Sequence, residues 1–423
     1  EMRKNYAMYY DYITRMDKKV GSLLKELEER GLAENTIVFY YADHGGVLPR
    51  SKRFIFESGT RVPFMIRFPE KYQDMAPGKP GERSDRLVSF VDLAPTLLSL
   101  TGMEPPENME GKAFLGQYKT RDPEYVHFFR GRMDERYDMM RGLRTQKYRY
   151  IRNYMPHRIY GQHIWYLWRS SATRVWEKEY ENGNCNPVQS RFWQTKTSEE
   201  LYDITEDPHN VHNLANDPEY QDVLKRMRKE NQRWVRARKD AGFLPEGMMN
   251  ELAGEKPVYD VTHDPDFPME SIISAAEMAS MQDPKNIDRL IELLNDTHPG
   301  VRYWAATGCA ILADQAQKAS PRLKKLLDDP YGDIRIAAAE ALCRMGDEKK
   351  GYKTLVQEMK SENQWVQLHS LNVLQSLGEE VPGPMVKEIM SVVPWRAQSS
   401  YFKKAHSILM QTLKPGWWDY IIW

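Results

Sequence analysis

The sequence predicts an α/β region, then a smaller antiparallel region, then an all-helical repeat region. Three observations predict this order: a helix followed by two apolar strand-like runs, a later pair of alternating runs around a short turn, and an internal repeat toward the C-terminal end. A chain of 423 residues is also too long for one typical core, so several domains are expected.

The first region combines helices with apolar strands. Residues 6–30 carry apolar side chains at helical spacing, and Gly31 supplies a stop signal. The runs 36–42 and 62–68 are rich in β-branched and aromatic residues, which is typical of buried strands in a parallel sheet. A second helix is expected over residues 89–100.

The second region is expected to be antiparallel. Residues 125–129, 141–144 and 148–152 have strand character, and the last two form a hairpin across Gln146-Lys147. A charged helix is expected over 218–241. The aromatic stretch before that helix is expected to be rich in loops.

The third region repeats itself. Aligned positions about 33 residues apart carry the same kinds of side chain, with leucine eleven positions before a β-branched residue: Leu290 and Val301, Leu323 and Ile334, Leu355 and Val366. This pattern resembles HEAT-type repeats, in which two helices flank a short Asp/Pro turn and must stack on neighbouring units. An unrelated helical bundle is the alternative. The expected division is therefore 1–124, 125–241, a Gly- and Pro-rich linker over 242–268, and helical repeats over 269–423.

Composition excludes two classes of partner. Sixty basic and sixty acidic side chains give a formal net charge of zero, which argues against nucleic-acid binding. No apolar stretch reaches the length of a membrane span. Cys185, Cys309 and Cys343 cannot form a disulfide framework, and the last two are expected in the repeat core.

The run 36–42 ends in Asp43-His44-Gly45-Gly46, which is a candidate metal site. Ligands of open α/β sheets bind outside the carboxyl ends of strands. A carboxylate beside an imidazole makes half of a metal shell, and the glycines allow a sharp turn. As an alternative, Asp43 caps a helix or forms a turn.

Downstream, Lys52 offers a compact positive charge to an anion. The block from the Asp-His pair through Lys52 and Glu57-Ser58-Gly59 to Val62-Pro63 resembles the sulfatase family of the alkaline-phosphatase-like superfamily. The resemblance spans roughly residues 1–240. The segment 154–168 looks most like bacterial relatives of heparan N-sulfatase.

The resemblance implies a sulfatase-like α/β fold with a small antiparallel C-terminal subdomain. It implies that Asp43 and His44 are metal ligands, usually for calcium, and that Lys52 holds the sulfate. The family's nucleophile is a formylglycine that lies before the Asp-His strand, and no matching motif precedes Asp43. Cys185 lies after the strand and does not fit the motif. We therefore expect a chain that lacks its nucleophile segment and any signal peptide, is inactive alone, and is periplasmic or secreted by family habit.

Further substrate-binding candidates are Arg53, at the edge of the site, and His157, Arg158 and His163 in a cationic and aromatic segment. Such a segment can bind a sulfated sugar by charge and ring stacking. A packed loop with surface charges is the alternative.

The favoured function is a sulfatase that hydrolyses sulfate esters or N-sulfate groups of a sulfated glycan, with heparan-type glycans preferred. One alternative is a metal-dependent phosphoesterase of the same superfamily, for which zinc or manganese would replace calcium. The other is a non-catalytic scaffold in which the helical repeats bind a partner protein.

Overall fold

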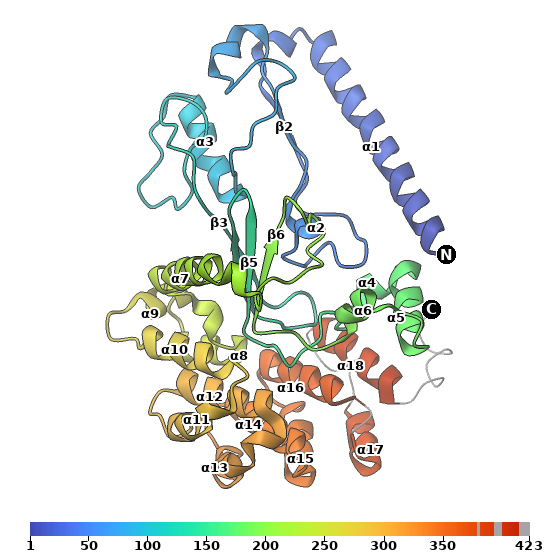
Figure 1. Cartoon of the computed structure of the whole chain (residues 1–423), viewed down its shortest axis with the longest axis vertical. Helices are drawn as coiled ribbons and strands as arrows, with labels where there is room; N and C mark the ends of the chain where they lie inside the picture. Colours follow the sequence, from blue (N-terminus) through green and yellow to red (C-terminus); the bar gives the residue numbers. More distant parts are fainter. Residues whose placement is uncertain (379–380, 393–399, 414–423) are drawn as a thin grey trace.

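The computed structural model describes residues 1–378, 381–392 and 400–413. Figure 1 shows a long helix and a two-stranded ribbon above a central four-stranded sheet, with a curved array of helices below. The predicted order of an α/β region, an antiparallel region and helical repeats is therefore confirmed. None of the helices in these ranges is long and apolar enough to cross a bilayer.

The first helix, α1 (Met2–Glu29), matches the prediction, and Gly31 at φ +66° follows its end. A short 3-10 turn, η1 (Ala33–Asn35), comes next. None of the α1 residues is buried, so apolar side chains such as Tyr10 and Leu23 are more than half exposed. The helix runs along the outside of the upper part of the molecule (Figure 1).

The two apolar runs form β1 (Val38–Tyr41) and β2 (Phe64–Arg67), which pair antiparallel with Tyr40 opposite Met65. The prediction of parallel strands was therefore wrong. Parallel neighbours need a long crossover connection, usually a full helix. The connection here holds only the one-turn helix α2 (Glu57–Thr60), so the chain reverses and pairs with itself.

The predicted helix 89–100 is present as η3 (Phe90–Asp92) followed by α3 (Leu93–Leu100). The Asp92 carboxylate accepts from the backbone N–H of Ser89 at 2.9 Å, which completes a capping box at the start. The stretch before it contains η2 (Glu70–Met75).

The central sheet is antiparallel throughout, in the order β3-β4-β5-β6. The predicted hairpin is confirmed, since Leu143 pairs with Tyr150 across the turn. The strands are β3 (Val126–Arg130), β4 (Met140–Arg144), β5 (Tyr148–Asn153) and β6 (Glu199–Asp203).

The aromatic stretch expected to be loop-rich contains several helical segments. Its aromatic side chains pack together, with Trp176 stacked on Phe192 at 4.6 Å between ring centroids, and this burial supports short helices. The segments are α4 (Trp165–Trp168), α5 (Ser171–Glu181), α6 (Pro187–Ser190) and η4 (Arg191–Trp193).

The segment 242–268, predicted to be a linker, is instead folded and packed. Phe243 and Met248 are fully buried, because this segment fills the space between the sheet and the repeats. The elements from the predicted charged helix onward are η5 (Pro218–Tyr220), α7 (Gln221–Ala237), η6 (Ala241–Phe243), α8 (Glu246–Ala253) and α9 (Val258–His263).

Helical repeats follow, as predicted. The predicted repeat region, 269–423, includes residues 379–380, 393–399 and 414–423, which lie outside the described residues. The elements are α10 (Met269–Ala279), η7 (Pro284–Asn286), α11 (Ile287–Leu293), α12 (Pro299–Leu312), η8 (Ala313–Ala319), α13 (Ser320–Leu326), α14 (Gly332–Arg344), α15 (Glu348–Glu358), α16 (Gln364–Leu377), α17 (Gly383–Ser391) and α18 (Ser400–Leu413).

The repeated leucine and β-branched positions are all essentially buried, so they form the stacked core. In two of the three units an arginine follows the β-branched residue, Arg302 after Val301 and Arg335 after Ile334, and it has a structural role. Arg302 donates through Nε to Asp329 at 2.9 Å, and Arg335 donates in the same way to Glu358 at 2.7 Å. Each arginine therefore ties one repeat to an acid of the next.

The largest core joins the sheet to the repeats. Tyr154, which follows β5, packs edge-on against Phe243 and Trp304, and the Trp304 indole Nε1 donates to the Phe243 carbonyl at 2.7 Å. The small sheet and the repeat array therefore share one continuous interior.

Candidate functional site

The turn that follows β1 is shaped by two glycines. A Cβ on Gly45 would lie 1.9 Å from the Ser58 carbonyl oxygen, and one on Gly46 would lie 2.6 Å from the Tyr9 hydroxyl. Gly45 N–H donates to Gly59 O at 3.0 Å, and Lys52 N–H donates to Gly46 O at 3.1 Å. The chain therefore folds back so that the Lys52 backbone lies beside the Asp43–Gly46 turn.

Asp43 and His44 lie next to one another, as the sequence predicts for two metal ligands. The His44 Nε2 is 3.2 Å from an Asp43 carboxylate oxygen, and its Nδ1 is 2.6 Å from the Gly45 carbonyl oxygen. If Nδ1 carries the proton for that carbonyl, the Nε2 lone pair is left for a cation. The Asp43 side chain is 84% exposed, so its carboxylate is accessible.

This donor pair fits part of a cation shell. In the part of the chain that the structure describes, no three His, Cys, Asp or Glu side chains come together as a metal site. Calcium takes six to eight ligands, mostly oxygen. Asp43 and His44 can thus supply two ligands, one of them the carboxylate oxygen that calcium favours.

Lys52 and Arg53 both lie near the ring of Tyr166, which the sequence did not single out for this role. The Arg53 guanidinium lies 3.4 Å from the centroid of the Tyr166 ring, and the Lys52 Nζ lies 5.3 Å from it. The Tyr166 hydroxyl is buried and has no hydrogen-bond partner in the structure. Tyr166 lies in the aromatic segment noted in the sequence, but its spacing gave no sign of contact with a loop more than a hundred positions away.

Arg53 is a buried cation in an uncommon backbone conformation. Its side chain is fully covered, its φ is +83°, and its Nη2 donates to Asp134 Oδ2 at 2.7 Å. Burial lowers the pKa of Arg53 to about 10, and Asp134 opposes that effect, so the side chain stays charged at neutral pH. Its Nε and Nη1 are buried and have no hydrogen-bond partner in the structure.

Glu57 holds this loop against the sheet. Its carboxylate accepts from Arg149 Nε at 3.1 Å and from Arg144 Nη1 at 3.3 Å, and its backbone N–H donates to Asn210 Oδ1 at 2.8 Å. Arg144 of β4 therefore pairs with an acid of this loop. The loop is fixed to β4, β5 and the segment after β6.

The candidates His157 and Arg158 lie at the contact with the repeats. Arg158 Nη2 donates to Glu340 of α14 at 2.6 Å, and His157 Nε2 is 3.5 Å from the same carboxylate. Burial together with the Arg158 charge lowers the pKa of His157 well below its ordinary value, so the ring is neutral at physiological pH. These contacts match the alternative of a packed segment, and their role in substrate binding stays a prediction.

The candidate His163 is also packed. Its ring stacks on Trp168 at 4.3 Å between centroids, and burial next to Arg136 lowers its pKa to about 3. The structure thus places Lys52 and Arg53 near Tyr166, whereas His163 stacks on Trp168. Its sugar-binding role likewise stays a prediction.

The cysteines expected in the repeat core, Cys309 and Cys343, are buried, as predicted. Burial raises the pKa of Cys309 to about 12, so it remains a thiol. Cys185, which precedes α6, is half-buried.

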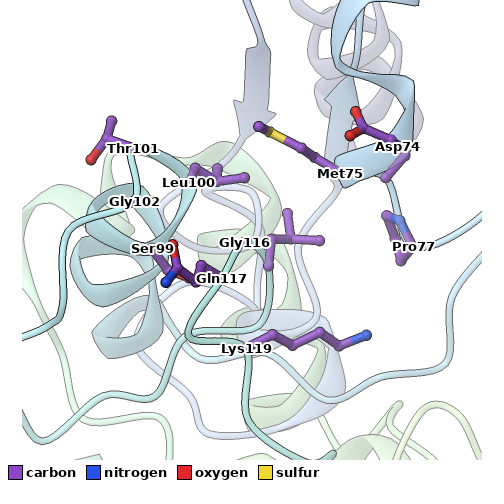
Figure 2. Close-up of a pocket in the computed structure, with 12 residues that line it drawn as sticks. Asp74, Met75, Pro77, Ser99, Leu100, Thr101, Gly102, Gly116, Gln117 and Lys119 are labelled. Carbon is purple, nitrogen blue, oxygen red and sulfur yellow. The ribbon is translucent and has the colours of Figure 1, made fainter.

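A separate hollow of about 550 Å³ opens beside the end of α3 (Figure 2). Asp74 and Lys119 are the charged groups in its lining, and they come from η2 and the segment after α3. None of the predicted site residues lines it. Its chemistry offers neither the cation ligands nor the clustered cations of the Lys52 loop.

Comparisons with known proteins match two separate parts of the chain. A sulfatase family model matches residues 1–103, and a HEAT-repeat model matches residues 261–343. An ulvan-active sulfatase from Formosa agariphila is 44% identical over 267 residues, which are 62% of this chain and 44% of that protein. The N-sulphoglucosamine sulphohydrolase of Homo sapiens is 26% identical over 274 residues, which are 59% of this chain and 51% of that protein.

A solved structure of a candidate sulfatase from Bacteroides thetaiotaomicron is 24% identical with a TM-score of 0.41, and the match covers 55% of this chain and 43% of that one. The chain spans about half the length of the curated relatives it matches. The sulfatase match contains the Asp43–Lys52 loop, and the HEAT match contains Arg302 and Arg335. The chain therefore resembles the sulfatase family over residues 1–103 and HEAT repeats over residues 261–343.

Proposed function

We propose that this chain is the sulfate-binding and repeat-bearing portion of a sulfatase that acts on a sulfated polysaccharide. The loop after β1 carries the proposal, because it holds Asp43, His44 and Lys52 on one folded turn within the part of the chain that matches the sulfatase family. The two adjacent cations of this loop suit a dianionic or monoanionic sulfate group.

Each residue has a distinct role in the proposal. The Lys52 ammonium binds sulfate oxygens, and the charged Arg53 supports it from below the surface. Asp43 and His44 would hold a divalent cation, for which calcium is the family expectation, and a bound cation neutralises charge on the sulfate oxygens. Attack on sulfur is assigned to a formylglycine that is not among these 423 residues.

The substrate class differs from the first expectation. The sequence favoured a heparan-type glycan, but identity is 44% to an ulvan-active sulfatase and 26% to the N-sulphoglucosamine sulphohydrolase. The higher identity to the ulvan-active sulfatase does not favour a heparan-type substrate. We propose a sulfated polysaccharide substrate, with ulvan oligosaccharides as the first substrates to test.

Calorimetric titration with calcium chloride and with inorganic sulfate tests the assigned residues. Asp43→Ala should weaken calcium binding, and Lys52→Ala should weaken sulfate binding about tenfold, because a charge-assisted contact is lost. Lys25→Ala, on the exposed face of α1, is the matched control and should leave both affinities unchanged.

Unchanged sulfate affinity in Lys52→Ala would contradict the assignment. A clear preference for zinc or manganese over calcium would favour the phosphoesterase alternative instead. Desulfation of ulvan oligosaccharides by these 423 residues alone would show that the nucleophile lies within the chain.

A further inference from the structure

A tight turn between β3 and β4 lies between the Lys52 loop and the repeats. Met133 N–H donates to Arg136 O at 2.7 Å, and Arg136 N–H donates back to Met133 O at 3.1 Å. Asp134 in the middle has φ +48°. These bonds fix the directions in which the side chains of the turn leave the backbone.

On one side, the turn holds the Lys52 loop. Asp134 Oδ2 accepts from Arg53 Nη2 at 2.7 Å. The Glu135 carboxylate accepts from the backbone N–H of Trp165, the first residue of α4. The next residue is Tyr166, whose ring stacks on Arg53, so the turn contacts Arg53 both directly and through its stacking partner.

On the other side, the turn holds the repeats. Arg136 Nη1 donates to Asn372 Oδ1 at 2.9 Å, and its Nη2 donates to Gln375 Oε1 at 2.6 Å, both on α16. The Asn372 amide nitrogen donates to Leu368 O at 2.8 Å, and that of Gln375 donates to Thr412 Oγ1 at 3.2 Å. Because the nitrogens are used within the repeats, the amide oxygens face Arg136.

Arg136 has little freedom to replace these partners. It is 2% exposed, and its Nε donates to the His163 carbonyl at 2.8 Å. A buried charged group that loses its acceptors is either left without hydrogen bonds or shifts to find others. Because Arg136 closes the turn with Met133, a shift of Arg136 also shifts Asp134.

We infer that α16 of the HEAT repeats positions the Lys52–Arg53 loop through this turn, with Asp134 and Arg136 as positioning residues. What the loop binds rests on the proposed function, whereas the coupling itself does not. The repeats are then part of the construction of the site and do more than offer a surface to a partner protein.

Hydrogen exchange in the full chain tests this coupling. The amides of Lys52 and Phe54 are bonded within the loop, to Gly46 O and Ser51 O, and report its opening. Gln375→Ala should make these two amides exchange about tenfold faster, because one acceptor of Arg136 is lost. Asp134→Asn, which keeps the side-chain size but removes the negative charge that pairs with Arg53, should have a similar effect.

Ser280→Ala is the matched control. Ser280 is buried just after the end of α10, and its hydroxyl accepts from Arg152 Nη2 at 2.6 Å, so it joins repeats and sheet without a bond to the turn. Exchange at Lys52 and Phe54 should stay at the wild-type rate in this variant. In the double variant with Asp134→Asn and Gln375→Ala, the effects should fall short of additive, because both act on one chain of contacts.

Loop exchange in Gln375→Ala equal to that of the wild type, or raised equally by Ser280→Ala, would overturn the inference. If Gln375→Ala does not fold by far-ultraviolet circular dichroism, Asp134→Asn measured on α16 amides gives the same test in reverse. Faster loop exchange together with no binding of inorganic sulfate to the wild type would support the coupling while refuting the proposed function.

Discussion

The buried carboxylate of Glu57 shows how a single residue fixes the candidate site. Its side chain is 5% exposed and lies between Arg144 and the fully covered Arg149. Burial lowers the pKa of Arg149 to about 10 and Glu57 opposes that effect, so this arginine remains charged and needs its partner. The pair joins the loop after β1 to the central sheet.

Glu57→Gln should therefore destabilise the protein. We expect the free energy of unfolding to fall by about 3 kcal/mol, because the substitution leaves the buried Arg149 charge without its counterion. Urea denaturation measures this change. Glu110→Gln, whose exposed carboxylate pairs with Arg238 at 3.0 Å, should change it by less than about 1 kcal/mol. Equal effects in the two variants would contradict the role of Glu57.

Among site residues, those close together in sequence were predictable and the distant ones were not. Asp43, His44 and Lys52 share one loop, so a motif identifies them together. Asp134 pairs with Arg53 from 81 positions away, and no spacing rule connects the two. Their contact depends on how β3 and β4 place a turn beside the loop.

At the scale of single elements, α14 carries an acid that anchors the antiparallel region to the repeats. Glu340 is 4% exposed and contacts Arg158 at 2.6 Å and Arg344 at 2.8 Å. Burial alone would raise the pKa of Glu340, but the two guanidinium groups outweigh burial and hold it well below its ordinary value of 4.5.

This shift predicts a specific loss of stability in acid. Because the folded protein binds the Glu340 proton less readily than the unfolded chain, the stabilisation is fully present above pH 4.5 and is lost as the pH falls below that value. The difference in unfolding free energy between wild type and Glu340→Gln should therefore be constant near neutral pH and shrink in acid. Urea unfolding over a pH series measures it. A difference that does not change with pH would contradict the assignment.

Elements differed in how well the sequence predicted them. The helices α1 and α7 and the hairpin of β4 and β5 follow from local spacing and turn residues. The direction in which β1 and β2 pair does not, because an apolar run fits either kind of sheet and the connection decides the direction. The segment 242–268 was predicted to be a linker from its Gly and Pro content. That content does not indicate whether Phe243 is buried, and the structure buries it completely.

At the scale of the whole molecule, the sheet and the repeats share an interior. Met139, Tyr154 and Met155 from the antiparallel region lie in the same cluster as Phe243 and the repeat helices. Further contacts cross the same boundary, including Arg152 with Ser280. Two regions with a common core are expected to unfold as one unit.

Trp304→Ala tests this cooperation. Trp304 is fully buried in α12 and contacts Tyr154 from the antiparallel region, so truncation should lower the free energy of unfolding by about 4 kcal/mol. Scanning calorimetry should show one transition for both regions in the wild type and one, at lower temperature, in the variant. Separate transitions, with the sheet unaffected by the substitution, would contradict a shared core.

The sequence by itself determined the helical repeats, the antiparallel hairpin and the Asp43–Lys52 loop. Each of these depends on residues that are close together in the sequence or that recur from one repeat to the next. The tertiary structure decided how β1 and β2 pair, that Lys52 and Arg53 both lie near the ring of Tyr166, and that Arg158 packs on Glu340 of the repeats. These outcomes depend on burial and charge pairing between distant segments, which local spacing cannot encode because the partner becomes a neighbour only when the whole chain has packed.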